Sequence, residues 1–93
     1  MENNPFKSRI KIAKLEIQVL RLQSELFEKV LSFDYYERTA KEIAEGFFFS
    51  CNTNYRATKG SKYTGLKDDE VDYINEMLDK IDSLNAKIYE LQK

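Results

Sequence analysis

The sequence predicts an all-α fold: a small helical bundle of two long helices and one shorter helix in a single domain over residues 1–93, completed by oligomerisation. Apolar side chains recur at alternating spacings of three and four over residues 10–31 and 74–91, which is the period of one helix face. One proline in the chain, with 42% hydrophobic and 33% charged residues, is typical of an ordered helical protein. A domain of this length buries only about 60 to 65% of its unfolded surface, so a second copy would enlarge a marginal core.

The first helix is expected over residues 5–32, because Asn4 and Pro5 suit the N-cap and the first helical position. Two apolar stripes run along it. The first stripe contains Ile10, Ala13, Ile17, Leu20, Ser24, Phe27 and Leu31, and the second contains Ile12, Leu15, Val19, Leu22 and Leu26. A two-residue offset places the stripes about 160° apart around the helix, so both sides need cover. We assign the second stripe to an interface between copies of the chain, a homo-oligomer.

A second, shorter helix is expected over residues 34–49. Asp34 and Glu37 form an Asp-x-x-Glu capping pair, although a single kinked helix that continues from the first is the competing interpretation. One face of this segment carries apolar residues at helical spacing, namely Phe33, Tyr36, Ala40, Ile43 and Phe47. Phe47, Phe48 and Phe49 surround more than half of a helical turn, so one neighbour cannot cover all three. We therefore add these phenylalanines to the predicted interface.

Residues 50–66 form a long irregular loop with two glycines and no hydrophobic period. No acidic residue lies between residues 46 and 67, whereas the loop contains the basic and aromatic residues Tyr55, Arg56, Lys59, Lys62 and Tyr63. Basic side chains neutralise phosphates and tyrosine rings stack on bases, so these five residues are the candidate site for a small anionic ligand. An ordinary surface loop with scattered lysines is the alternative interpretation.

The last helix is expected over residues 67–92. Leu66 and Val71 are spaced as a hydrophobic staple around an N-cap at Lys67. The apolar seam that we expect to pack on the first helix of the same chain consists of Ile74, Met77, Ile81, Leu84, Ile88 and Leu91. Residues 68–82 of this helix contain seven acidic residues and one lysine. We expect this acidic half to neutralise the basic loop, within or between subunits.

Catalysis, cofactors and bound metal ions are not expected. The chain has no histidine, which removes the usual acid/base group and the commonest metal ligand, and its single cysteine, Cys51, excludes an internal disulfide. Asp72, Glu76 and Asp79 lie on neighbouring turns, but we expect this face to act electrostatically rather than to bind a cation. No apolar run approaches the roughly 18 residues that a membrane span needs, and residues 1–10 lack the apolar region of a signal peptide. We expect a cytoplasmic protein.

A net charge of −1 and the acidic start of the last helix argue against extended nucleic acid as a partner. The segment YTGLKDDEV at residues 63–71, followed by Ile74, Ile81 and Leu84, resembles the tyrosine-led helix start in the small phage anti-CBASS proteins. That resemblance implies an all-helical, oligomeric sponge that sequesters cyclic-nucleotide signals between its subunits.

Two functions are therefore open. The first is a non-enzymatic, self-associating binding protein, an inhibitor or adaptor that acts on a protein partner and is encoded by a phage or another mobile element. The alternative is a sponge that sequesters a small anionic ligand, such as a cyclic oligonucleotide, with the basic tyrosine loop.

Overall fold

The computed structural model describes residues 5–33, 35–46, 56–60, 62 and 64–93. In these ranges the chain forms no strand and three α-helices, α1 (Pro5–Leu31), α2 (Glu37–Ala44) and α3 (Asp68–Gln92). The predicted all-α class, with two long helices and one shorter helix, is confirmed. Its completion by oligomerisation stays a prediction.

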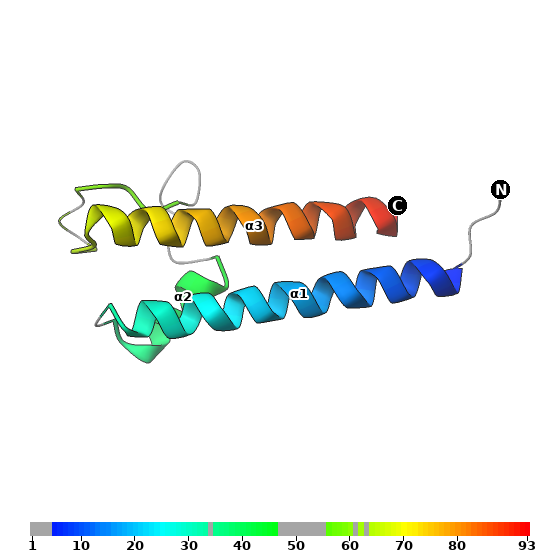
Figure 1. Ribbon diagram of the computed structural model, residues 1–93, viewed down its shortest axis with the longest axis horizontal. Helices are drawn as coiled ribbons and strands as arrows, with labels where there is room; N and C mark the ends of the chain where they lie inside the picture. Colours follow the sequence, from blue (N-terminus) through cyan, green and yellow to red (C-terminus); the bar gives the residue numbers. More distant parts are fainter. Residues whose placement is uncertain (1–4, 34, 47–55, 61, 63) are drawn as a thin grey trace.

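The two long helices lie side by side and antiparallel, and α2 packs on α1 at one end of the pair (Figure 1). The molecule measures 54 × 24 × 20 Å and has a radius of gyration of 15.5 Å, whereas a compact chain of this length has a radius of about 12 Å. The fold is therefore an elongated helical hairpin with a third helix at one end only. The opposite end, formed by residues 5–18 and 83–93, is termed the open arm below.

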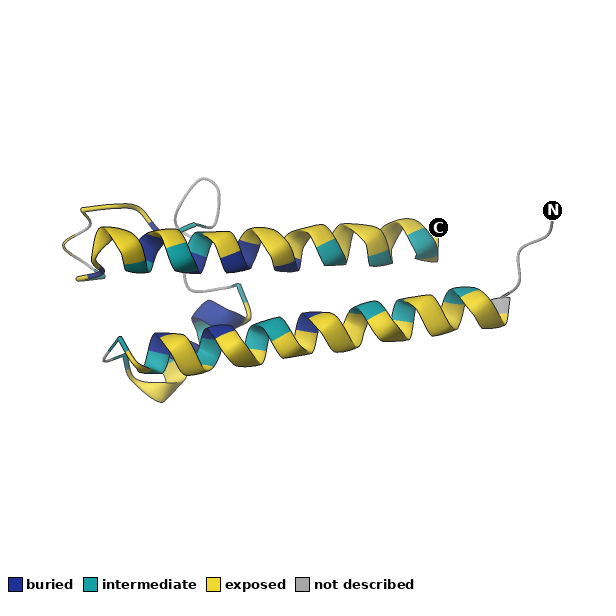
Figure 2. Cartoon of the chain, in the orientation of Figure 1, coloured by how far each residue is buried: buried dark blue, intermediate teal, exposed yellow. Residues whose placement is uncertain are grey.

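The hydrophobic core is concentrated at the α2 end of the hairpin (Figure 2). Its largest fully buried side chains come from all three helices and are Leu26, Val30, Ile43, Val71 and Ile74. In the open arm, none of the described side chains is fully buried. Burying one large aliphatic side chain stabilises a fold by roughly 1.5 to 3 kcal/mol, so most of the hydrophobic stabilisation comes from the α2 end.

The apolar seam of α3 packs on α1 of the same chain, as predicted. Its buried or partly buried residues are Ile74, Met77, Ile81, Leu84 and Ile88. The helix begins after the predicted N-cap Lys67, whose backbone N–H donates a hydrogen bond to Oε1 of Glu70 at 2.9 Å. Leu66 and Val71, which form the predicted staple, are both buried in the core. Local signals at the start of α3 therefore agree with its packing.

The second helix is shorter than predicted. It covers Glu37–Ala44 instead of residues 34–49, and α1 ends separately at Leu31, so the alternative of one kinked helix is wrong. Gly46 adopts a φ of +85°, and its backbone N–H donates to the carbonyl oxygen of Ile43 at 3.0 Å. A left-handed glycine just beyond the C-cap is a common way to end a helix.

The predicted apolar face of α2 is partly wrong. Ala40 and Ile43 are fully buried, but Tyr36 is 86% exposed because it precedes the helix as its N-cap. The predicted capping residue Asp34 lies outside the described residues. The same holds for the predicted interface residues Phe47, Phe48 and Phe49.

The assignment of the two α1 stripes is wrong. Val19 and Leu26, from the stripe predicted to join two copies, are 8% and 0% exposed within one chain. Leu22 of this stripe packs against the same core, and Ile12 and Leu15 are half-buried. The physical reason is the composition of the stripes. The second stripe is large and aliphatic at all five positions, whereas the first contains Ala13 and Ser24 and so buries less apolar area against α3.

Candidate functional site

The structure brings the described residues of the basic loop onto the acidic face of α3. Nε and Nη2 of Arg56 donate to Oδ1 of Asp79 at 3.0 and 2.8 Å, and Nη2 also donates to Oδ2 of Asp82. Burial alone would lower the pKa of the Arg56 guanidinium, but its hydrogen bonds to the two carboxylates outweigh burial and raise its pKa above the ordinary value. Arg56 is therefore ion-paired with two carboxylates of α3.

Asn75 holds the next residue of the loop. Its Oδ1 accepts a hydrogen bond from the backbone N–H of Ala57 at 2.8 Å, and its Nδ2 donates to the carbonyl oxygen of Ala57 at 2.9 Å. One side-chain amide thus satisfies both backbone groups of a buried residue, which would otherwise carry a desolvation cost. Sequence reasoning missed Asn75. The available signal is its position at helical spacing from Asp72 and Asp79 on one polar face.

Lys59 continues the same arrangement, since its Nζ lies 3.2 Å from Oδ1 of Asp72. Residues 56–59 thus follow a polar stripe along α3 that consists of Asp72, Asn75, Asp79 and Asp82. These contacts agree with the expectation that the basic loop and the acidic half of α3 neutralise each other, and they do so within one chain.

The predicted anion site is not assembled in the described residues. Arg56 and Lys59 contact carboxylates instead of forming a joint cationic surface, and Lys62 is exposed. Tyr55 and Tyr63, the predicted stacking residues, lie outside the described residues. An anionic ligand would have to compete with Asp72, Asp79 and Asp82 for these cations.

The carboxylates on the acidic face of α3 also lie beside basic side chains of the same chain. Asp72 lies beside Lys59, Asp79 beside Arg56, and Oε1 of Glu76 is 4.0 Å from Nζ of Lys80. Across the described ranges of the chain, no group of three histidine, cysteine or acidic residues is arranged to hold a metal ion.

A small polar cavity of about 210 Å³ lies beside Arg56, between the C-terminal end of α2 and α3. It is smaller than the roughly 300 to 1,000 Å³ of typical ligand pockets. Its charged groups include Arg56 and Asp82, which already bind each other. The cation that lines this cavity is therefore already paired with a carboxylate.

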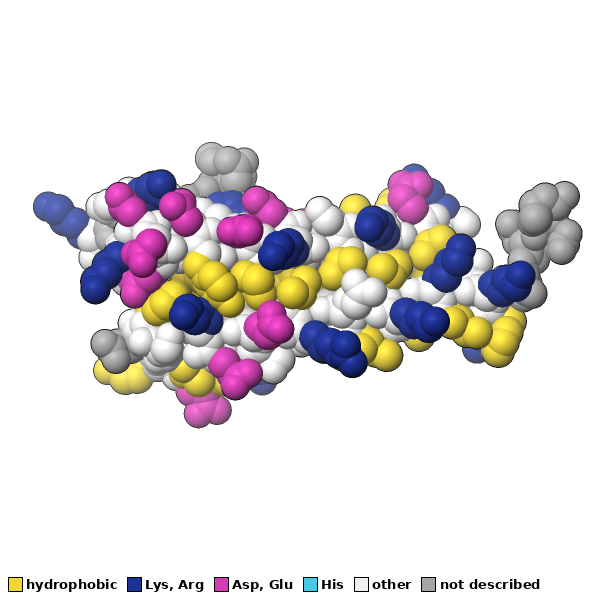
Figure 3. Space-filling model, viewed as in Figure 1, with side chains coloured by type: hydrophobic (Ala, Val, Ile, Leu, Met, Phe, Trp, Pro, Cys, Tyr) yellow, Lys and Arg dark blue, Asp and Glu magenta, His cyan; other side chains and the backbone are white. Residues whose placement is uncertain are grey.

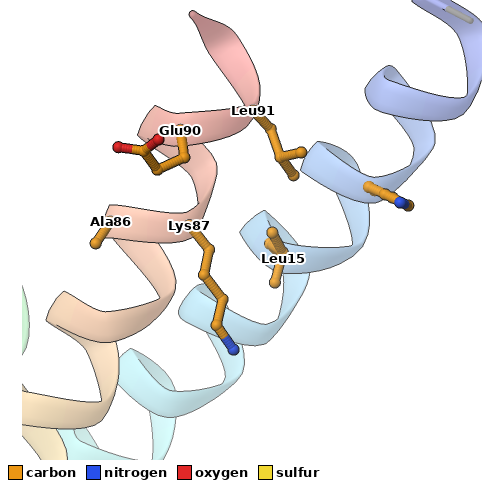
Figure 4. A pocket seen from close by; sticks show the side chains of 6 residues that line it. Leu15, Ala86, Lys87, Glu90 and Leu91 are labelled. Atoms are coloured by element: carbon orange, nitrogen blue, oxygen red, sulfur yellow. The ribbon is translucent and has the colours of Figure 1, made fainter. Parts of the chain in front are cut away.

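The open arm contains a larger apolar groove of about 450 Å³ between α1 and α3. Figure 4 shows Leu15 on α1 and Leu91 on α3 at opposite sides of this groove, with Lys87 and Glu90 near its edge. The groove exists because α2 covers the other end of the hairpin only, and two helices alone cannot enclose their apolar faces (Figure 2).

The first stripe of α1 is a second uncovered apolar surface. Its exposed large residues, together with Phe6 one turn earlier at the same spacing, are Phe6 (69% exposed), Ile10 (39%), Ile17 (50%) and Leu20 (64%). Leu15 in the groove lies about 160° around the helix from Ile17. The groove and the stripe are therefore on nearly opposite sides of α1.

Charge is distributed unevenly along the hairpin. The open arm contains six basic and two acidic residues, whereas the remaining described residues contain nine basic and twelve acidic ones. Figure 3 shows most acidic side chains over the α2 half of this face and mainly basic ones over the arm, on either side of an apolar band along the α1–α3 seam. The groove thus lies in a basic environment.

Comparisons with protein families, curated proteins and solved structures found no match to this chain. The resemblance to the anti-CBASS proteins therefore stays a prediction. Within the described residues, no helix combines the length and hydrophobicity that crossing a membrane requires.

Proposed function

We propose that this chain is a non-enzymatic, self-associating helical binding protein that acts on a protein partner as an adaptor or inhibitor. The observation that carries the proposal is the open arm, where two long helices lie together with an apolar groove on one side and an apolar stripe on the other. Apolar surface left in water contributes no hydrophobic stabilisation, which a marginally stable domain needs. These two surfaces therefore favour a binding role.

The groove favours an acidic amphipathic helix as the partner segment. Its apolar lining residues are Leu15, Ala86 and Leu91, which suit apolar anchors at helical spacing. Lys11 and Lys87 line the same groove, and the arm as a whole has an excess of basic residues. Acidic residues beside the anchors of a partner would therefore be attracted to this end of the hairpin.

The test uses the protein purified from its own host and measured by native mass spectrometry. Ala86→Glu places a carboxylate at the groove, and Asn85→Glu introduces the same side chain at an exposed position that does not line it. We expect a protein partner to copurify with the wild type and with Asn85→Glu, and to be lost from Ala86→Glu at unchanged helical content. Retention of the partner by Ala86→Glu would contradict the assignment of the groove.

The sponge alternative has less support, because Arg56 and Lys59 are already paired with carboxylates of α3. A panel of cyclic di- and trinucleotides separates the two functions, since a ligand that binds the folded state raises the melting temperature by mass action. The binding-protein proposal expects no shift at micromolar ligand. A clear shift that disappears in Arg56→Gln would favour the sponge.

A further inference from the structure

We infer that a second copy of this chain covers the exposed stripe of α1, with the two α1 helices antiparallel about a two-fold axis near residues 18 and 19. The inference rests on the self-association in the proposed function and specifies its geometry. The stripe has the alternating spacing of a two-helix seam from Phe6 to Leu31. Along this seam, Phe6, Ile10, Ile17 and Leu20 are large side chains in contact with water.

One antiparallel register matches the stripe to itself along its whole length. The pairs across the axis are Phe6 with Leu31, Ile10 with Phe27, Ala13 with Ser24, and Ile17 with Leu20. Each large side chain of the stripe then faces another large side chain of the stripe, so this register buries the most apolar area that the stripe offers. Shifting the register by seven residues, so that Ile17 faces Ala13, leaves Phe27 and Leu31 with no stripe residue opposite them and buries less apolar area.

Charge selects the antiparallel direction over the parallel one. A parallel pair would bring the basic arms of both copies together, including Lys7, Arg9 and Lys14 of each α1. The antiparallel pair instead places each arm beside the neutral end of the other α1, where Glu25 and Glu28 balance Arg21 and Lys29, so the basic arms no longer face each other. The helix dipoles of two antiparallel helices also attract each other, which favours the antiparallel pair.

The rest of the fold leaves room for this pairing. Phe27 and Leu31, at the far end of the stripe, are only half-buried by the core, and Tyr36 nearby in sequence is 86% exposed. The arm groove lies on nearly the opposite side of α1 from the stripe, so a dimer still presents one groove per subunit. The dimer is therefore bivalent for its partner.

Cysteine cross-linking tests the register. In a Cys51→Ser background, Ala13→Cys and Ser24→Cys variants are labelled with different masses, mixed, oxidised and separated without reductant. Both positions are exposed in the single chain, so neither variant disturbs the core. The antiparallel register predicts a disulfide between the two variants in the mixture and little dimer in either variant alone. A parallel pair predicts the reverse.

Sedimentation at micromolar concentration provides the second measurement. We expect a dimer for the wild type and at least a tenfold weaker dimer for Ile17→Glu, at unchanged helical content. The control is Gln18→Glu, which introduces the same side chain one residue away and outside the stripe. A wild-type monomer would overturn both this inference and the self-association in the proposed function. A dimer that forms same-variant disulfides, or no disulfide in the mixture, overturns the antiparallel register alone.

Discussion

Asn75 shows how much one residue contributes to the attachment of the loop. Its amide binds both backbone groups of Ala57, while Asp72 and Asp79 on either side bind Lys59 and Arg56. Charge patterning predicted the ion pairs, because an acidic helix face and a basic loop are both visible in the sequence. The amide has no charge and no place in the apolar period, so the sequence did not single it out.

Asn75→Asp should destabilise the fold by about 1 to 3 kcal/mol. The carboxylate still accepts from the N–H of Ala57 but has no hydrogen to donate to its carbonyl oxygen, and it adds a negative charge between Asp72 and Asp79. Urea denaturation followed by circular dichroism measures the change. Asn85→Asp, an exposed substitution of the same kind on the same helix, should cost under about 0.5 kcal/mol. Equal losses in the two variants would contradict the role of the Ala57 contact.

Tyr35 makes the stability depend on alkaline pH. Its hydroxyl donates to the carbonyl oxygen of Thr64, and burial, with a contribution from the charge of Glu70, raises its pKa above the ordinary 10.0. The unfolded chain therefore loses this proton at lower pH than the folded chain does. Stability from Tyr35 is complete below pH 10 and declines as the pH rises through the raised pKa.

Tyr35→Phe removes both the hydrogen bond and the titration. We expect a loss of about 0.5 to 1.5 kcal/mol at neutral pH, with the wild-type and variant stabilities converging above pH 10. Denaturation at a series of pH values measures both effects. A difference that stays constant up to pH 11.5, or about 1.5 units above the ordinary value, would count against the raised pKa.

At the level of elements, caps and periods predicted the long helices well and the short one poorly. The bounds of α1 and α3 lie within one residue of the predicted ranges, because Pro5 and the Leu66–Val71 spacing are local signals. In α2, the aromatic residues that follow Gly46 favoured a longer helix, but the backbone of this glycine takes another conformation. The two stripes of α1 share one period, so period alone did not distinguish the face that meets α3.

Gly46→Ala tests the termination of α2. A Cβ at this position would meet nothing within 4 Å, so the cost comes from forcing alanine into a φ of +85° and should be about 1 kcal/mol. Gly46→Asn should cost less, because asparagine tolerates left-handed backbone better than alanine. Thermal unfolding of the two variants gives the order. If Asn is as destabilising as Ala, the conformation of Gly46 does not explain the helix end.

At the level of the whole molecule, the hairpin is stable at one end and thinly packed at the other. Leu26 is fully buried in the core at the α2 end, whereas Leu15 is half-buried in the groove of the arm. Composition predicted a marginal core and an uncovered surface. It did not predict that the core would lie at one end of the hairpin and the uncovered surface at the other. This separation arises because α2 is short while α1 and α3 are long.

A leucine side chain should therefore contribute more to stability at the α2 end of the hairpin than in the open arm. Leu26→Ala should destabilise the folded chain by about 2 to 5 kcal/mol through a buried cavity, and Leu15→Ala by less than about 1.5 kcal/mol. Urea denaturation compares the two directly. Amide hydrogen exchange should likewise be faster over residues 8–16 than over residues 22–30. Similar losses for both leucines would show that the core extends into the arm.

The order of the helices along the chain affects how the protein is made. α1 and α3 pack together, yet roughly 60 residues separate the end of α1 from the end of α3, which takes about 3 to 12 s of synthesis at 5 to 20 residues per second. During that time the face of α1 that carries Leu26 lacks its main cover. The proposed self-pairing surface needs no residue beyond Leu31, so neighbouring ribosomes on one messenger can bring two nascent α1 helices together before either hairpin closes.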